Sequence, residues 1–179
     1  SWREAEQLHV TLRFFGEVPE PEADDLDAEL STVGGEAFDL TLAGVGAFGL
    51  GLKARAVWAG VESSVQLKRL AAKCEGAARR AGLPPETRAY QPHVTLAYLR
   101  GVGPEAVERW RVKHALLRTS PFRVSWFGLY SSTLGRSGSR YRLAGPLLDA
   151  VLPLLAGPGR GRLRRDARSP AHLANLTPD

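Results

Sequence analysis

The tetrapeptide His-Val-Thr-Leu occurs twice in this chain, at residues 9–12 and again at residues 93–96. In an extended strand, residues i and i+2 lie on one face about 6.6 Å apart, so each histidine stands beside its threonine. The valine and leucine of each copy point to the opposite face, where they suit a hydrophobic core. A polar pair on an apolar backing, present twice, favours two equivalent strands whose polar faces line a cleft.

The remaining hydrophobic pattern alternates strands with helices and predicts two similar lobes of the α+β class. The strongest helix signal covers residues 67–81, where apolar residues recur every three or four positions until Gly82. Two other helices are expected after Pro21 and near Pro104. Strands are expected at residues 8–15, 38–42, 56–61, 93–99, 122–130 and 140–143.

Composition narrows the class of protein. No apolar run approaches the roughly 20 residues of a membrane-spanning helix, so we expect no membrane association. The single cysteine, Cys74, cannot form an internal disulfide, which favours a reducing cytoplasm. Of the net charge of +5, five arginines and two aspartates in residues 157–179 supply +3. Residues 1–147 therefore form the expected domain, and residues 148–179 a flexible, Gly/Pro/Arg-rich extension.

Two histidines and two threonines facing one cleft suit acid–base chemistry at phosphorus. An ordinary imidazole titrates near pH 6.5, so one ring can accept a proton while the other donates one. A threonine hydroxyl can donate to a phosphoryl oxygen. Two alternatives remain open: His9 and His93 are structural strand histidines, or they bind zinc. Zinc, however, usually takes three or four ligands, and we expect no metal and no cofactor.

The two motifs and their flanks resemble those of the 2H phosphoesterases, and most closely the bacterial RNA 2′,3′-cyclic phosphodiesterases, also called 2′-5′ RNA ligase-like proteins. The resemblance covers about residues 2–147. It includes Trp2 with residues 8–16, the strand at 56–61, the helix ending at Gly82, and residues 92–96. It ends with residues 129–132, Gly135 and Tyr141.

The resemblance implies a bilobal fold in which two antiparallel sheets flank a central cleft with one motif on each side. It implies hydrolysis of 2′,3′-cyclic phosphates on RNA ends or nucleotides to 2′-phosphates, with weak reversible 2′-5′ RNA ligation as an allied activity. It assigns His9 as proton donor, His93 as proton acceptor, and Thr11 and Thr95 as phosphate ligands. By strand alternation Arg13 shares the face of His9 and Thr11, and we expect it to bind substrate. We expect the protein to act as a monomer.

The chain departs from the family pattern in two places. Family members begin with a strand and a helix before the Trp2 block, so we expect an N-terminally truncated chain. The family often has a basic residue five positions after the second histidine, where this chain has Tyr98, with Arg100 as the next candidate. Two other functions stay open: an RNA-end binding module without turnover, and an enzyme for another small cyclic nucleotide such as ADP-ribose cyclic phosphate. Phe15, Phe48 and Tyr98 are candidates for stacking on a base.

Overall fold

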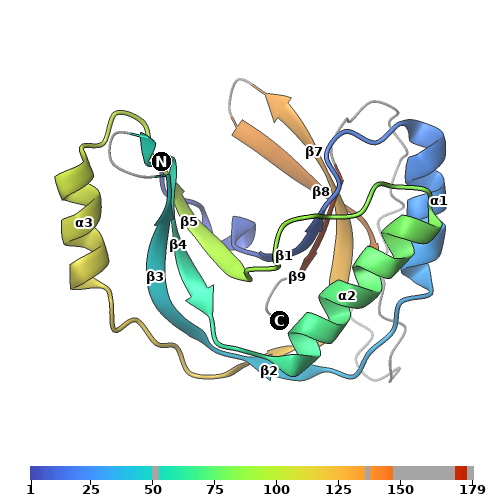
Figure 1. The fold of residues 1–179 in the computed structure, drawn as a ribbon, viewed down its shortest axis with the longest axis horizontal. Coiled ribbons are helices and arrows are strands. Elements are labelled where there is room, and N and C mark those ends of the chain that lie inside the picture. Colours follow the sequence, from blue (N-terminus) through green and yellow to red (C-terminus); the bar gives the residue numbers. More distant parts are fainter. Residues whose placement is uncertain (50–52, 136–137, 147–171, 177–179) are drawn as a thin grey trace, which may run out of the picture.

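The computed structural model describes residues 1–49, 53–135, 138–146 and 172–176 (Figure 1). Its elements in chain order are η1 (Ala5–Gln7), β1 (Val10–Phe14), α1 (Glu20–Ser31), β2 (Phe38–Leu40), β3 (Leu42–Phe48), β4 (Ala56–Val61), α2 (Val65–Arg80), β5 (His93–Tyr98), α3 (Pro104–Lys113), β6 (Phe122–Val124), β7 (Phe127–Gly135), β8 (Gly138–Pro146) and β9 (His172–Leu176). None of the helices in these ranges is long and apolar enough to cross a membrane.

The strands form two antiparallel sheets, as the sequence predicts for an α+β fold. The larger sheet has the order β3-β4-β5-β1-β9-β7-β8, and the smaller sheet pairs β2 with β6. Neighbouring strands β1 and β5 meet at one Cα pair, Val10 and Val94, whereas β4 and β5 pair along most of their length. The larger sheet therefore divides at this junction, and Figure 1 shows its two halves as the arms of an open V. The two motif strands belong to different halves, with one motif on each: β5 is the inner strand of one half and β1 the inner strand of the other, and the two meet at the junction.

Each half of the sheet has its own hydrophobic core. The larger core lies where α2 contacts β1 and α1, and it contains the fully buried side chains of Leu26, Leu30, Leu67 and Cys74. The smaller core lies between α3 and the β4–β5 pair, around Val57, Ala97 and Val107. In Figure 1 α1 and α2 accordingly lie beside one arm and α3 beside the other.

Helix α2 follows the sequence signals closely. The Ser64 side chain accepts a hydrogen bond from the backbone N–H of Leu67 at 3.1 Å, which caps the first turn. The buried face comprises Leu67, Leu70, Ala71, Cys74, Ala77 and Ala78, which confirms the predicted periodicity. Gly82 ends the helix with a φ of 84°, and the N–H of Leu83 bonds back to the carbonyl of Ala78 at 3.0 Å.

The structure differs from the sequence prediction in three segments. The single strand expected at residues 122–130 is divided into β6 in the smaller sheet and β7 in the larger one. The single strand expected at residues 38–42 is two strands in different sheets, and β3 continues to Phe48. The alternation of β3 is hidden in the sequence because glycines occupy two of its positions. Residues 172–176 were expected within a flexible extension but form β9, between β1 and β7. The rest of that expected extension, residues 147–171 and 177–179, lies outside the described residues.

Candidate active site

The paired motif strands place the candidate catalytic groups on one face of the larger sheet. Val10 and Val94 lie directly opposite each other, and both are buried in the core. Side chains alternate between the two faces of a strand, so the residues flanking these valines occupy the other face. That face carries the histidine and the threonine of each motif, and all four residues are half-buried.

The antiparallel register crosses the two motifs. Continued by one residue to either side of the Val10–Val94 pair, the antiparallel register sets His9 opposite Thr95 and His93 opposite Thr11. In a regular antiparallel ladder, directly opposite residues have Cβ atoms about 4.5–5.5 Å apart and diagonal neighbours are about 7–8 Å apart. Each imidazole is therefore next to a threonine of its own strand and next to the threonine of the other strand.

Both imidazole rings are held in the same way by the backbone two residues earlier. His9 Nδ1 is 2.7 Å from the carbonyl oxygen of Gln7, and His93 Nδ1 is 2.8 Å from the carbonyl oxygen of Gln91. A carbonyl oxygen only accepts hydrogen bonds, so Nδ1 of each ring is the donor and carries a proton. Any proton that each ring exchanges with a bound molecule therefore resides on Nε2.

The surroundings of His9 favour its neutral form. Burial lowers the pKa of this imidazole, and the positive charge of Arg3 and the neighbouring His93 lower it further. The hydrogen bond to the Gln7 carbonyl acts in the opposite direction but does not cancel the effect of burial.

Aromatic rings surround His93 on its own half of the sheet. The Phe48 ring meets the imidazole edge-on, with centroids 4.7 Å apart, and the Trp58 ring lies 6.0 Å from it. Trp58 lies across Gly46 of the neighbouring strand, where a Cβ atom would overlap the indole. Phe48, one of the aromatic residues suggested by the sequence for base stacking, contacts the motif histidine His93 and is 37% exposed.

A β-bulge interrupts each motif strand at the leucine of its motif. Thr11 and Arg13 pair with adjacent residues of β9, so Leu12 is the extra residue in β1. In the same way Thr95 and Ala97 pair with adjacent residues of β4, and the extra residue is the motif leucine of β5. The bulge reverses strand alternation beyond it, so the second residue after each motif threonine points to the opposite face of the sheet.

The bulge corrects the predicted orientation of Arg13, which does not share the face of Thr11. Its side chain is 10% exposed, and the guanidinium lies between α2 and the loop after it, with Nε 2.6 Å from Glu75 and Nη1 3.3 Å from Glu86. It also donates to the backbone carbonyls of Phe14 and Pro84 at 2.6 and 2.8 Å. These contacts favour a structural role for Arg13 over the expected contact with substrate.

Sequence reasoning missed Arg3 and Trp58 as neighbours of the histidines. Arg3 is separated from the first motif by η1, and its position becomes clear only because Trp2 pairs with Ala97 and brings the N-terminal segment beside β5. The available signal for Trp58 was its place in the strand predicted at residues 56–61. Its cross-strand partner in β5 is Thr95.

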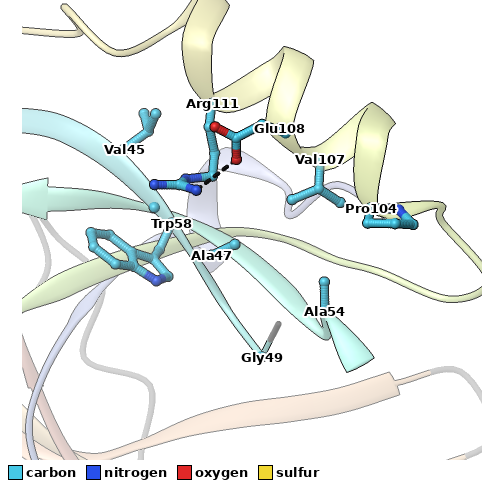
Figure 2. Close-up of a pocket in the computed structure, with 10 residues that line it drawn as sticks. Val45, Ala47, Gly49, Ala54, Trp58, Pro104, Val107, Glu108 and Arg111 are labelled. Carbon is cyan, nitrogen blue, oxygen red and sulfur yellow. Dashed lines mark hydrogen bonds and ion pairs between the residues drawn. The ribbon is translucent and has the colours of Figure 1, made fainter. Parts of the chain in front are cut away.

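A hollow of about 390 Å³ lies away from the histidines, between α3 and the β3–β4 pair. Figure 2 shows Glu108 and Arg111 of α3, joined by an ion pair of 2.7 Å, across the hollow from Trp58. No motif histidine or threonine lines it. Within the described ranges, no three His, Cys, Asp or Glu side chains are grouped as a metal site would need.

Known proteins resemble this chain in sequence and in fold. The sequence profile of the 2′-5′ RNA ligase superfamily matches residues 1–136. An RNA 2′,3′-cyclic phosphodiesterase of Aeropyrum pernix is 35% identical over 142 residues, which are 78% of this chain and 80% of the relative. One from Escherichia coli is 32% identical over 138 residues, 76% of this chain and 73% of the relative. The crystal structure of E. coli LigT with 3′-AMP superposes with a TM-score of 0.63 at 30% identity, covering 81% of this chain and 78% of that one.

Proposed function

The chain belongs to the 2′-5′ RNA ligase superfamily, and we propose that it hydrolyses the 2′,3′-cyclic phosphates of RNA ends or nucleotides to 2′-phosphates, without a metal. Relatives in Aeropyrum pernix and Escherichia coli carry the name of this activity. The observation that carries the proposal is the crossed arrangement of His9, Thr11, His93 and Thr95 on one face of the sheet.

The two imidazoles supply the proton transfers of the reaction. Nε2 of His93 accepts a proton from water as the water oxygen bonds to phosphorus. Nε2 of His9 gives its proton to the 3′-oxygen as the bond between that oxygen and phosphorus breaks, which leaves a 2′-phosphate and a 3′-hydroxyl. The hydrogen bonds from Nδ1 to Gln7 and Gln91 keep each Nε2 directed away from the backbone and available for this transfer.

The threonine hydroxyls hold the phosphate between the imidazoles. In the antiparallel register Thr11 lies opposite His93 and Thr95 opposite His9. Each hydroxyl can therefore donate a hydrogen bond to a non-bridging phosphate oxygen while the imidazole beside it transfers a proton. A 5′-hydroxyl in place of water would attack phosphorus by the same route and give a 2′-5′ linkage. Ligation is therefore the allied activity that we propose for the same site.

Hydrolysis of 2′,3′-cyclic AMP and of a cyclic-phosphate-ended oligonucleotide, measured in EDTA from pH 5 to 9, tests the proposal. General acid–base groups contribute about 10²–10⁴-fold, so we expect His9→Ala and His93→Ala each to lower kcat by about this factor. His114→Ala is the matched control, because this half-buried histidine follows α3 and packs on Trp110. Undiminished hydrolysis by both motif variants would contradict the mechanism, and binding of the oligonucleotide without turnover would favour a binding module.

The pH profile supplies a second test. As proton donor, His9 must be protonated in the free enzyme, and its pKa lies below 6.5. We therefore expect kcat/KM to fall on the alkaline side at a lower pH than an ordinary histidine would give. This limb should disappear in the His9→Ala variant. A limb that persists in that variant would show that another group donates the proton.

A further inference from the structure

Arg3 is fixed beside the motif face by the backbone of the N-terminal segment. Its N–H donates to the carbonyl of Leu96 at 2.9 Å, and the preceding residue, Trp2, bridges to Ala97. The backbones of Ser1 and Tyr98 also exchange hydrogen bonds of 2.6 and 2.9 Å. The segment thus extends the sheet along β5, next to the junction where β5 meets β1.

The side chain of Arg3 lies over the ring of Tyr98. Its guanidinium carbon is 5.5 Å from the centre of that ring, within the range of a cation–π interaction. One guanidinium nitrogen, Nη2, is inaccessible to solvent, so the charge acts through a medium of lower dielectric than water. The charge acts on His9, where it opposes protonation of the imidazole.

The bulge in β5 explains why Tyr98 lies under this arginine. Alternation reverses after Leu96, so Tyr98 pairs with Ala56 and returns to the face that carries Thr95. Tyr98 is 47% exposed on that face. Its ring and the Arg3 guanidinium therefore border the same surface as the motif threonine.

The reaction needs a cation that the histidines alone do not supply. A cyclic phosphodiester carries one negative charge, and further negative charge builds up on its non-bridging oxygens as water adds. Protonated His9 offsets the charge on the leaving oxygen, while His93 is neutral before it accepts the proton of water. The guanidinium of Arg13 is already held by Glu75 and Glu86.

We propose that Arg3 binds the non-bridging phosphate oxygens of the substrate and that Tyr98 positions its guanidinium. This assignment rests on the proposed hydrolysis of cyclic phosphates. The planar fork of a guanidinium matches two phosphate oxygens, and its fixed charge stabilises the transition state more than the ground state. Position 98 of β5 is a tyrosine and carries no positive charge. Arg3, from the N-terminal segment, thereby provides that charge beside β5.

Kinetics of three variants test the role of Arg3. Loss of one such electrostatic contact typically costs about 10²–10³-fold in kcat, so we expect Arg3→Met to lower kcat/KM by at least about 100-fold. Arg3→Lys keeps the charge without the fork and should retain part of the activity. Arg109→Met is the matched comparison, because Arg109 lies on α3 with a side chain that is 75% exposed, and we expect this variant to leave kcat/KM unchanged. Full activity in Arg3→Met, or a comparable loss in Arg109→Met, would overturn the assignment.

The pH profile separates this role from a purely structural one. The charged or titratable groups that act on His9 are Arg3 and His93. Removal of the Arg3 charge raises the pKa of His9, so the limb of kcat/KM that depends on His9 should move to higher pH in Arg3→Met but not in Arg3→Lys. A uniform loss of activity with no movement of this limb would contradict the proposed contact.

Tyr98 variants test the positioning of the guanidinium. Tyr98→Phe keeps an aromatic ring and should behave as the wild type, whereas Tyr98→Leu should lower kcat/KM about two- to five-fold, as loss of an exposed cation–π contact does. Equal activity of the two variants would remove Tyr98 from the proposal.

Binding of adenosine 2′-phosphate distinguishes failure of this assignment from failure of the proposed function. Calorimetric titration needs no turnover, and we expect Arg3→Met to bind this nucleotide at least ten-fold more weakly than the wild type. If the wild type binds it but hydrolyses no cyclic phosphate, the proposed function fails while the binding role of Arg3 remains. Equal affinity of the two proteins would refute the role of Arg3.

Discussion

Replacing Arg13 with methionine removes a buried cation but keeps most of the apolar stem of the side chain. The side chain is 10% exposed, and its guanidinium joins Glu75 of α2 to Glu86 of the following loop. Nη2 also donates to the carbonyl of Pro84. Arg13→Met leaves these acceptors without their donor, and in particular leaves the Glu75 carboxylate, which is 27% exposed, without its cation. We expect the variant to lose stability rather than affinity for substrate.

The magnitude follows from the burial of the partners. Breaking a fully buried ion pair costs about 3–5 kcal/mol, because one charge is left uncompensated. Here the two carboxylates keep about a quarter of their surface in water, and Glu86 retains Arg88 at 2.8 Å. A cost of about 2–3 kcal/mol is therefore expected. For a protein of this length, this corresponds to a fall in Tm of about 4–12 °C.

Thermal unfolding followed by circular dichroism, together with KM for 2′,3′-cyclic AMP, measures both effects. Arg88→Met is the matched control, because Arg88 contacts the same Glu86 from a side chain that is 73% exposed. It should cost less than about 1 kcal/mol. If Arg13→Met melted with the wild type and instead raised KM, the substrate-binding role expected from strand alternation would be correct and the structural role refuted.

Three further predictions concern the packing and titration of other groups. Gly46→Ala should lower the free energy of unfolding by about 1–3 kcal/mol and lower kcat, because the added Cβ would displace the Trp58 ring beside His93. Gly34→Ala is the control and should have little effect, because a Cβ there meets no atom within 4 Å. Equal stability and activity of the two variants would contradict this packing. Hydrogen bonds from Arg88 lower the pKa of Glu86 to about 2 from 4.5, so this carboxylate stabilises the fold above pH 4.5 and the contribution is lost as the pH falls toward 2. Between pH 5 and 2.5, Tm should fall less in the Glu86→Gln variant than in the wild type. An equal fall in the two proteins would show that Glu86 does not contribute to the loss of stability in acid. Burial raises the pKa of Cys74 to about 12, so a thiol reagent at pH 8 should label the native protein only as it unfolds, and immediate labelling would contradict the buried position.

Helix and strand positions that depend on local pattern could be predicted from the sequence. Residues 56–61 form β4 as expected, and the spacing of apolar residues in α2 matches its buried face. These segments succeed because burial selects the same periodicity that the sequence displays. The pairing of the two motif strands, which sets each motif histidine opposite the threonine of the other motif, depends on contacts between residues distant in sequence. Hydrophobic periodicity does not encode such contacts.

The two β-bulges mark the limit of reasoning from alternation. A strand without a bulge would place Arg13 beside Thr11, and the sequence contains no signal that Leu12 is an extra residue. The insertion becomes visible only through the pairing of β1 with β9. The bulge in β1 turns Arg13 away from the motif face. The equivalent bulge in β5 directs Tyr98 toward that face, where its ring contacts Arg3.

The position of β9 has a consequence for the order in which the chain folds during synthesis. The arm formed by β3, β4, β5 and α3 uses residues 42–113, so all its strands have left the ribosome long before residue 172 is added. By contrast, β1 forms its ladder on one side with residues 173–176, and β7 pairs with the same strand. Contacts between such distant residues form late and slowly. Until then the nascent chain exposes an open strand edge beside His9, and we expect a chaperone or a low temperature during expression to raise the yield of native protein.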